Sequence, residues 1–265
     1  INEIMVDLCK QLEEKYGLTE ALIAVPAYEQ SSDQEVAFQA VDYILRVLKK
    51  NMVFGMTWGR AMHEFVEQLA KDERLRSLSF QNVKVVPFLG TPGAIQSDSW
   101  NTTTYSNTLA TKVGNLLHCA SYNLSAPMYV EGTKEKELIE SIDEIAKVLH
   151  MAETADIALI GIGSMQDDSS IIKAEIRTKE EYKELVRKGA VGEIVGRIYD
   201  KNGQTVDEDL KRKMVGISLD KIAKIPVRVG MSYGKDKIEA IKGAIAGGLV
   251  NVLVTDVPTA ELLLK

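Results

Sequence analysis

The residues best suited to hold an anion form a glycine-rich turn, Gly55-Met56-Thr57-Trp58-Gly59, which follows a short apolar run. After this turn, apolar residues at helical spacing mark one face of a helix: Met62, Phe65, Val66 and Leu69. Glycine lets the backbone approach a ligand closely, and the free N–H groups at the start of a helix favour a phosphate. The Thr57 hydroxyl can add a donor. The pattern predicts a phosphate-binding turn, although many strand-to-helix turns carry glycine for steric reasons alone.

Two lysines form a second candidate anion site. Lys235 and Lys237 follow the run Gly230-Met231-Ser232-Tyr233-Gly234 and lie in the first turn of a predicted helix. The helix dipole disfavours cations at that end, so a bound phosphate would explain their position. The alternative is a solvated surface pair, because exposed dipole effects are only about 0.3–1 kcal/mol.

Glu193 and Arg197 fall on the same face of an alternating segment, 193–199, which predicts a strand. A carboxylate at this place could accept hydrogen bonds from sugar hydroxyls. The alternative is a surface strand that faces water, and the residues by themselves favour that interpretation. The run Asp200-Lys201-Asn202-Gly203 then predicts a turn.

Two further polar residues follow a predicted strand. Thr91 lies between Gly90 and Pro92 and could donate to a phosphate, or it could simply belong to a turn. Asn107, with Thr103 and Thr104, could cap the helix that starts nearby. A capped helix start at the edge of a site would still serve a ligand.

Motifs for catalysis, metal binding and nucleotide binding are missing from the sequence. The three histidines, His63, His118 and His150, are scattered over helical stretches without partners at metal spacing, which favours structural roles. The chain has no Gly-x-Ser-x-Gly elbow and no His-Glu-x-x-His motif. It also lacks the P-loop ending and the dinucleotide fingerprint. We therefore expect no catalytic residues, no metal and no cofactor.

The elements that position these residues alternate between buried strands and helices. Strands are expected in the apolar run before the first glycine turn and at 21–25, 83–89, 127–130, 156–163, 226–230 and 251–256. Helices are expected after that turn and at 4–16, 36–48, 105–122, 134–151, 179–188 and 235–246. This alternation predicts an α/β fold with a mainly parallel sheet.

Ligands of such sheets bind at the carboxyl ends of the strands. Four glycine-containing turns are predicted at these ends, at Gly55, Gly90, Gly161 and Gly230. The polar segment 94–104 is long for a simple connection, and long loops of this kind are often functional. The glycine turns on one edge of the sheet therefore favour a ligand site there.

Length and charge limit the function further. The 265 residues carry a net charge of −6, which argues against nucleic-acid binding by this chain itself. No run of 18 apolar residues and no signal-peptide pattern is present, so we expect no membrane contact. Cys9 and Cys119 are isolated, which fits a reducing cytoplasm.

No linker divides residues 1–265, which are expected to form one domain. The sequence opens on Ile1 in a helix pattern, so we expect further chain before it.

Five segments, in this order and spacing, together resemble the C-terminal effector-binding domain of the SorC family of bacterial sugar-responsive transcriptional regulators. They are Gly55-Met56-Thr57-Trp58-Gly59, Ala158-Leu159-Ile160-Gly161-Ile162-Gly163, Gly189-Ala190-Val191-Gly192-Glu193-Ile194-Val195-Gly196-Arg197, Gly216-Ile217-Ser218-Leu219 and the run from Lys237 to Asp256. The resemblance covers nearly the whole chain, and the combination is far more specific than any one segment.

The resemblance implies a Rossmann-like α/β fold with helices on both faces of the sheet, similar to glucosamine-6-phosphate deaminase and ribose-5-phosphate isomerase. It implies a phosphorylated sugar as effector. It also implies operator DNA as a partner, held through an N-terminal helix-turn-helix domain that this sequence lacks. Members of the family usually form dimers or tetramers.

The resemblance also assigns site residues. Gly55, Thr57, Trp58 and Gly59 would form a phosphate loop, with Gly161 and Gly163 in the second glycine turn. Lys237 would reach a phosphate, Glu193 would contact sugar hydroxyls, and Thr91 and Asn107 would line the pocket. The branch of the family that controls glycolytic genes has a second Thr or Ser in place of Trp58, and some members have a basic residue near Thr91. Both departures favour a monophosphate or a less charged sugar over a bisphosphate.

Two functions remain open from the sequence. The preferred hypothesis is a ligand-sensing domain without catalysis, in which the effector shifts subunit packing and operator binding. The alternative is a sugar-phosphate isomerase or deaminase on the same fold, since fold does not determine function. Glu193 is the only evident candidate for its general base.

Overall fold

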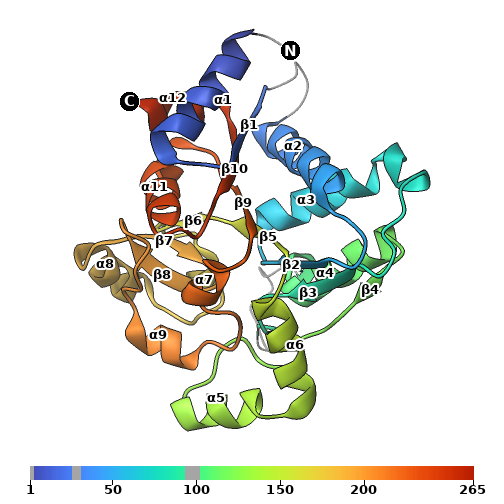
Figure 1. Ribbon diagram of the computed structural model, residues 1–265. Coiled ribbons are helices and arrows are strands. Elements are labelled where there is room, and N and C mark those ends of the chain that lie inside the picture. The colour runs from blue at the N-terminus through green and yellow to red at the C-terminus, as the bar shows by residue number, and fades with distance from the viewer. Residues whose placement is uncertain (1–2, 26–30, 93–101) are drawn as a thin grey trace.

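The computed structural model describes residues 3–25, 31–92 and 102–265. Its centre is a seven-stranded sheet with the order β1-β10-β9-β5-β2-β3-β4, in which every neighbouring pair is parallel (Figure 1). The strands are β1 (Glu20–Ala24), β2 (Val53–Met56), β3 (Lys84–Pro87), β4 (Ala120–Ser121), β5 (Ile157–Gly161), β9 (Val227–Met231) and β10 (Val252–Asp256). The predicted α/β class with a mainly parallel sheet is confirmed.

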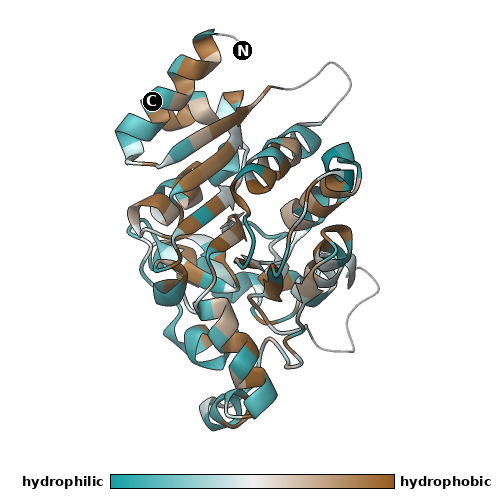
Figure 2. Ribbon diagram, turned by 45° about the vertical axis from the view of Figure 1, so that its right-hand side comes forward, coloured by the Kyte–Doolittle hydropathy of each residue, from teal (hydrophilic) through white to brown (hydrophobic). Residues whose placement is uncertain are grey.

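The central strands are apolar at almost every position because both faces of the sheet are covered. In β5, Ile157 and Leu159 point into one hydrophobic cluster, while Ala158 and Ile160 point into the other. Figure 2 shows these hydrophobic strands between helices. This two-sided burial explains why the strands appear as continuous apolar runs in the sequence.

Helices cover both faces of the sheet, as predicted. One face packs against α2 (Ser32–Val47), α3 (Arg60–Ala70) and α4 (Ser106–Leu116). The opposite cluster takes side chains from α1 (Glu3–Tyr16), α6 (Asp143–Glu153), α11 (Ile238–Ala246) and α12 (Val257–Leu264). Short 3₁₀ helices lie at η1 (Glu73–Arg76), η2 (Thr102–Thr104) and η3 (Lys235–Lys237). No helix of the described ranges is long and apolar enough to cross a membrane.

A small antiparallel sheet, β6-β7-β8, lies beside the main one. Its strands are β6 (Gly163–Ser164), β7 (Ala190–Ile194) and β8 (Arg197–Asp200), and short helices surround them: α7 (Ser170–Lys173), α8 (Lys179–Arg187), α9 (Glu208–Lys213) and α10 (Leu219–Ile222). The predicted single strand over 193–199 is wrong, because the chain reverses at Val195 and Gly196, both at positive φ. The predicted turn after Asp200 is confirmed by the hydrogen bond from the Gly203 N–H to the Asp200 carbonyl.

Three other predicted elements have different limits. The helix expected over 105–122 ends at Leu116, since His118 takes a positive φ and residues 120–121 pair with β3. The helix expected over 134–151 is two helices, α5 (Thr133–Glu140) and α6, because Ile142 is extended at ψ 124°. The strand expected at 127–130 makes only isolated bridges, to Thr91 and Met214. Most of the predicted loop 94–104 lies outside the described residues.

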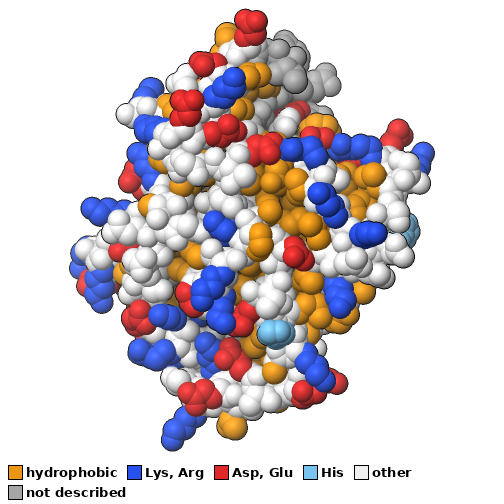
Figure 3. Space-filling view, in the orientation of Figure 1, with side chains coloured by type: hydrophobic (Ala, Val, Ile, Leu, Met, Phe, Trp, Pro, Cys, Tyr) orange, Lys and Arg blue, Asp and Glu red, His pale blue; other side chains and the backbone are white. Residues whose placement is uncertain are grey.

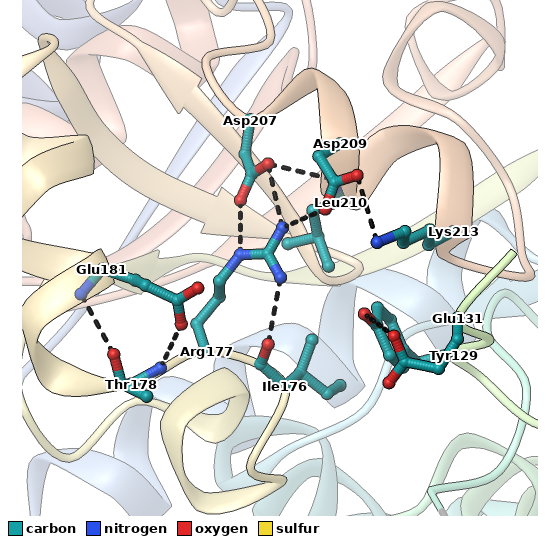
Figure 4. Close-up of polar contacts among 10 residues, drawn as sticks. All are labelled: Tyr129, Glu131, Ile176, Arg177, Thr178, Glu181, Asp207, Asp209, Leu210 and Lys213. Carbon is teal, nitrogen blue, oxygen red and sulfur yellow. Dashed lines mark hydrogen bonds and ion pairs between the residues drawn. The ribbon is translucent and has the colours of Figure 1, made fainter.

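A buried ion pair links Arg177, the residue before the N-cap of α8, to Asp207, the N-cap of α9 (Figure 4). The Arg177 guanidinium donates to both carboxylate oxygens of Asp207, at 2.8 and 3.1 Å, and also to Asp209 and the Ile176 carbonyl. Asp207 in turn caps α9 by accepting from the Leu210 N–H. The side chains of Arg177 and Asp207 are 10% and 7% exposed, so removal of one partner leaves the other charge buried.

We therefore expect Arg177→Met to lower the free energy of unfolding by about 3–5 kcal/mol, the usual cost of breaking one side of a buried ion pair. Urea denaturation measures this change. The matched control is Arg187→Met on α8, whose pair with Glu184 is exposed and should contribute at most about 1 kcal/mol. Equal effects of the two substitutions would contradict the assignment.

Candidate functional site

The order of the strands puts a topological switch point between β2 and β5. We call the carboxyl ends of these two strands, with the turns that follow them, the crevice. From β2 the chain continues to β3 and β4 on one side, and it then returns to β5, β9 and β10 on the other side. At such a switch point the connections leave in opposite directions, and ligands of open α/β sheets bind outside the carboxyl ends of these strands. Two predicted glycine turns meet there: Thr57–Gly59 after β2, and 161–164 at the end of β5.

The turn after β2 is tied directly to the end of β5. The Thr57 side chain is 1% exposed, and its Oγ1 accepts a hydrogen bond of 3.1 Å from the Gly161 N–H. Gly59 is the N-cap of α3 at φ +105°, a conformation that disfavours side chains. The structure therefore brings Thr57, Trp58, Gly59 and Gly161 together, as the sequence predicts.

Gly55 lies inside β2 and not in the turn where it was predicted. A Cβ on Gly55 would lie 2.0 Å from Cε1 of Phe88, whose fully buried ring covers this glycine. Packing therefore accounts for the glycine at position 55. Its contact with a ligand stays a prediction.

Glu193 is buried at the crevice, with 6% of its surface exposed. Its Oε1 accepts a hydrogen bond from the Gly196 N–H, and the Trp58 side chain also hydrogen-bonds the carboxylate. A Cβ on Gly163 would lie 2.8 Å from Glu193 Oε2, so this glycine leaves room for the carboxylate. Burial raises the pKa of Glu193 to about 7, against the opposing effects of these hydrogen bonds and of the Lys237 charge.

The interpretation of 193–199 as a water-facing strand is wrong, since Glu193 and Arg197 are both buried. Arg197 is 3% exposed, and its guanidinium donates to the carbonyls of Lys211, Met214 and Gly216 at 3.0–3.1 Å. These bonds fix the chain around α9, and they give Arg197 a structural role apart from Glu193.

Lys237 reaches the crevice through Ser164. Its Nζ donates to Ser164 Oγ at 3.1 Å, and the Ser164 hydroxyl donates to Asp236 Oδ2 at 2.9 Å. The Lys237 charge also lowers the pKa of Glu193. Lys235 is exposed, so the two predicted lysines have different surroundings.

Thr91 and Asn107 lie beyond β3 and are bonded to each other. The Asn107 amide donates to Thr91 Oγ1 at 2.8 Å and to the Leu124 carbonyl, and its oxygen accepts from the Leu124 N–H. The predicted capping role is wrong for Asn107, since Tyr105 is the N-cap of α4. Their contact with a ligand remains a prediction.

Ser164 and Asp236 belong to this site but were not predicted as site residues. Both had a signal in the sequence, because Ser164 directly follows the second glycine turn and Asp236 separates the two lysines. Among the described residues, no group of three or more His, Cys, Asp or Glu side chains could hold a metal ion. A surface hollow lined by Asn51, Asn82, Lys84 and His118 lies at the amino ends of β2 and β3, opposite the crevice.

Comparison with known proteins gives the class of this chain. A family model described as "Putative sugar-binding domain" matches residues 2–265. The sorbitol operon regulator of Klebsiella pneumoniae is 30% identical over 260 residues, which cover 97% of this chain and 79% of the regulator. The crystal structure of full-length SorC from that organism matches with a TM-score of 0.87 at 29% identity, over 100% of this chain and 82% of that one. The deoxyribonucleoside regulator of Bacillus subtilis (strain 168) is 25% identical over 96% of this chain and 78% of that protein.

The chain therefore belongs to the sugar-binding domain family whose members here are bacterial transcriptional regulators. More narrowly, it is a sugar-binding regulator domain of the SorC family. The resemblance drawn from the five sequence segments is confirmed.

Proposed function

We propose that residues 1–265 form the effector-binding domain of a cytoplasmic bacterial regulator of a sugar-metabolism operon, and that the effector is a phosphorylated sugar. One observation carries this proposal: a lysine and a buried glutamate meet two glycine turns at the switch point of the sheet. The ammonium group of Lys237 and the backbone N–H groups near Gly59 suit a phosphate. The Glu193 carboxylate suits sugar hydroxyls.

Operator DNA would be held by an N-terminal domain outside this sequence. The regulators that match are longer than this chain, which supports a further domain. The net charge of −6 also supports DNA binding by another domain, because DNA binding needs a basic surface. Acidic and basic side chains are interspersed over the face in Figure 3. Effector binding can change DNA binding only if the ligand has different affinities for two states of the protein. In our proposal these states differ in the packing of subunits in a homodimer or homotetramer.

Lys237→Ala tests the phosphate contact. A screen of phosphorylated and free sugars by thermal shift should find a selective ligand, since a ligand at about 100 times its Kd adds about 2.7 kcal/mol of stability. Because a hydrogen bond to a charged group contributes about 1.5–3 kcal/mol, we expect Lys237→Ala to lower the affinity for this ligand by at least about ten-fold.

Lys235→Ala is the matched control, because Lys235 lies two residues away and is exposed. It should leave the affinity nearly unchanged. A screen in which no phosphosugar shifts the melting temperature, or alters operator binding of the full-length protein, would contradict the proposal.

The second candidate function is a sugar-phosphate isomerase or deaminase, and one observation favours it. The pKa of Glu193 is raised to about 7, which suits a general base at neutral pH. No histidine or second carboxylate is hydrogen-bonded to Glu193 among the described contacts. Turnover of ribose 5-phosphate or glucosamine 6-phosphate by the pure protein, lost in Glu193→Gln, would establish the enzyme and exclude a sensing domain without catalysis.

A further inference from the structure

Asp236 places a negative charge beside Lys237, the lysine that is hydrogen-bonded to Ser164 at the crevice. Its Oδ2 lies 3.8 Å from Lys237 Nζ and accepts the Ser164 hydroxyl at 2.9 Å. Ser164 is 4% exposed and is bonded on both sides, since it also accepts from Lys237 Nζ. The serine therefore holds the carboxylate and the ammonium group together.

The backbone leaves room for this carboxylate. Gly234 takes φ +109°, and a Cβ there would lie 2.9 Å from Asp236 Oδ1. The Gly234 N–H is fixed by a 2.8 Å hydrogen bond to Thr259 Oγ1 on α12. Gly163, the residue before Ser164, makes the same kind of space for Glu193. The two carboxylates differ in exposure, since 49% of the Asp236 side chain is open to solvent while Glu193 is buried.

The charges of the crevice consequently do not favour a dianion. The Lys237 charge acts on Glu193 and lies next to Asp236, so one cation serves two carboxylates. A phosphate that binds Lys237 must compete with Asp236 for the ammonium group and must approach its negative charge. A neutral sugar hydroxyl meets no such opposition.

We propose that Asp236, held by Ser164, is the built-in counter-ion of Lys237 and limits the affinity of the crevice for phosphate groups. The inference rests on the proposed function, because it assumes that a phosphate contacts Lys237. It makes Asp236 a specificity-determining residue that favours a neutral sugar group over a phosphate at Lys237. The effect of Asp236 acts through Lys237.

Asp236→Asn tests this, with inorganic phosphate as the probe and the concentration dependence of the melting temperature as the readout. Asparagine keeps an oxygen that accepts the Ser164 hydroxyl while it removes the charge. We expect phosphate to bind about five-fold more tightly, which corresponds to about 1 kcal/mol, the interaction of two charges about 4 Å apart in water. The ratio of the affinity for glucose 6-phosphate to the affinity for glucose should rise by the same factor in Asp236→Asn.

Two variants serve as controls. Asp143→Asn removes an equal charge from an exposed position on α6 and should leave phosphate affinity unchanged. The double variant of Asp236→Asn and Lys237→Ala should show no increase in phosphate affinity. Equal phosphate affinity in the wild type and Asp236→Asn, an equal gain in Asp143→Asn, or a gain that survives the loss of Lys237 would each overturn the counter-ion role and leave the proposed function standing. Phosphate that stabilises none of these proteins would overturn the phosphate subsite and this inference together.

Discussion

Glu193→Gln is expected to stabilise the protein relative to the wild type as the pH rises from about 4.5 to 8. Burial raises the pKa of Glu193 from 4.5 to about 7 in the folded state. Between these values the folded state binds more protons than the unfolded state, so the stability from this carboxyl is complete at low pH and falls as the pH rises through about 7. The full fall is on the order of 3 kcal/mol, because each pH unit between the two pKa values corresponds to about 1.4 kcal/mol. Glutamine does not ionise and removes this loss.

Urea denaturation of both proteins across this pH range measures the difference. Glu137→Gln, on the exposed surface of α5, is the control and should follow the wild type. Parallel stability curves for the wild type and Glu193→Gln would show that the buried carboxyl does not titrate near neutral pH. Under the proposed function, Glu193→Gln should also bind the effector more weakly, since a carboxylate accepts stronger hydrogen bonds from hydroxyls than an amide does.

Gly55→Ala is expected to destabilise the protein by about 1–3 kcal/mol or more, the usual cost of an extra methyl in a packed core. The new Cβ would lie 2.0 and 2.1 Å from two ring atoms of Phe88. The ring cannot move away freely, because it is 0% exposed and packs within the hydrophobic core. The neighbouring strands β2 and β3 would have to separate or the ring would have to leave its site.

The double variant Gly55→Ala with Phe88→Leu separates these effects. We expect it to be more stable than the sum of the single changes implies, with a coupling of about 0.5–3 kcal/mol. Gly132→Ala is the matched control, since Gly132 has φ −119° and the nearest atom to a new Cβ is 3.8 Å away. Additive changes in unfolding free energy would rule out the contact between residue 55 and the Phe88 ring as the cause.

The sheet and its ligand edge could be predicted because their signals are local. Each central strand is a short apolar run that ends near glycine or proline, and parallel strands present their carboxyl ends at one edge. The meeting of Thr57 with Gly161 follows from that rule. The reason for the glycine at position 55 does not follow from it, since the clash that excludes a side chain there comes from Phe88, the residue after the neighbouring strand β3.

The small sheet was missed because its turn does not resemble one in the sequence. Val195 is β-branched and yet takes φ +54°, so Glu193, Val195 and Arg197 alternate like a strand while the chain reverses. Burial of Arg197 depends on carbonyls around α9, which no local pattern reveals. Helices α5 and α6 were merged for a related reason, since Leu138, Ile142, Ile145 and Leu149 keep helical spacing across the break.

The pairing of β1 with β10 has a consequence for how the protein is made. β1 is an edge strand, and its partner in the sheet lies near the other end of the chain. Helix α1 likewise binds α12, where Lys15 and Tyr16 donate to the Leu263 carbonyl. During synthesis the ribosome releases β1 long before β10, so β1 has no partner strand until β10, more than 200 residues later, has been made. Such non-local closure slows folding, and in the meantime the unpaired β1 can associate with other nascent chains.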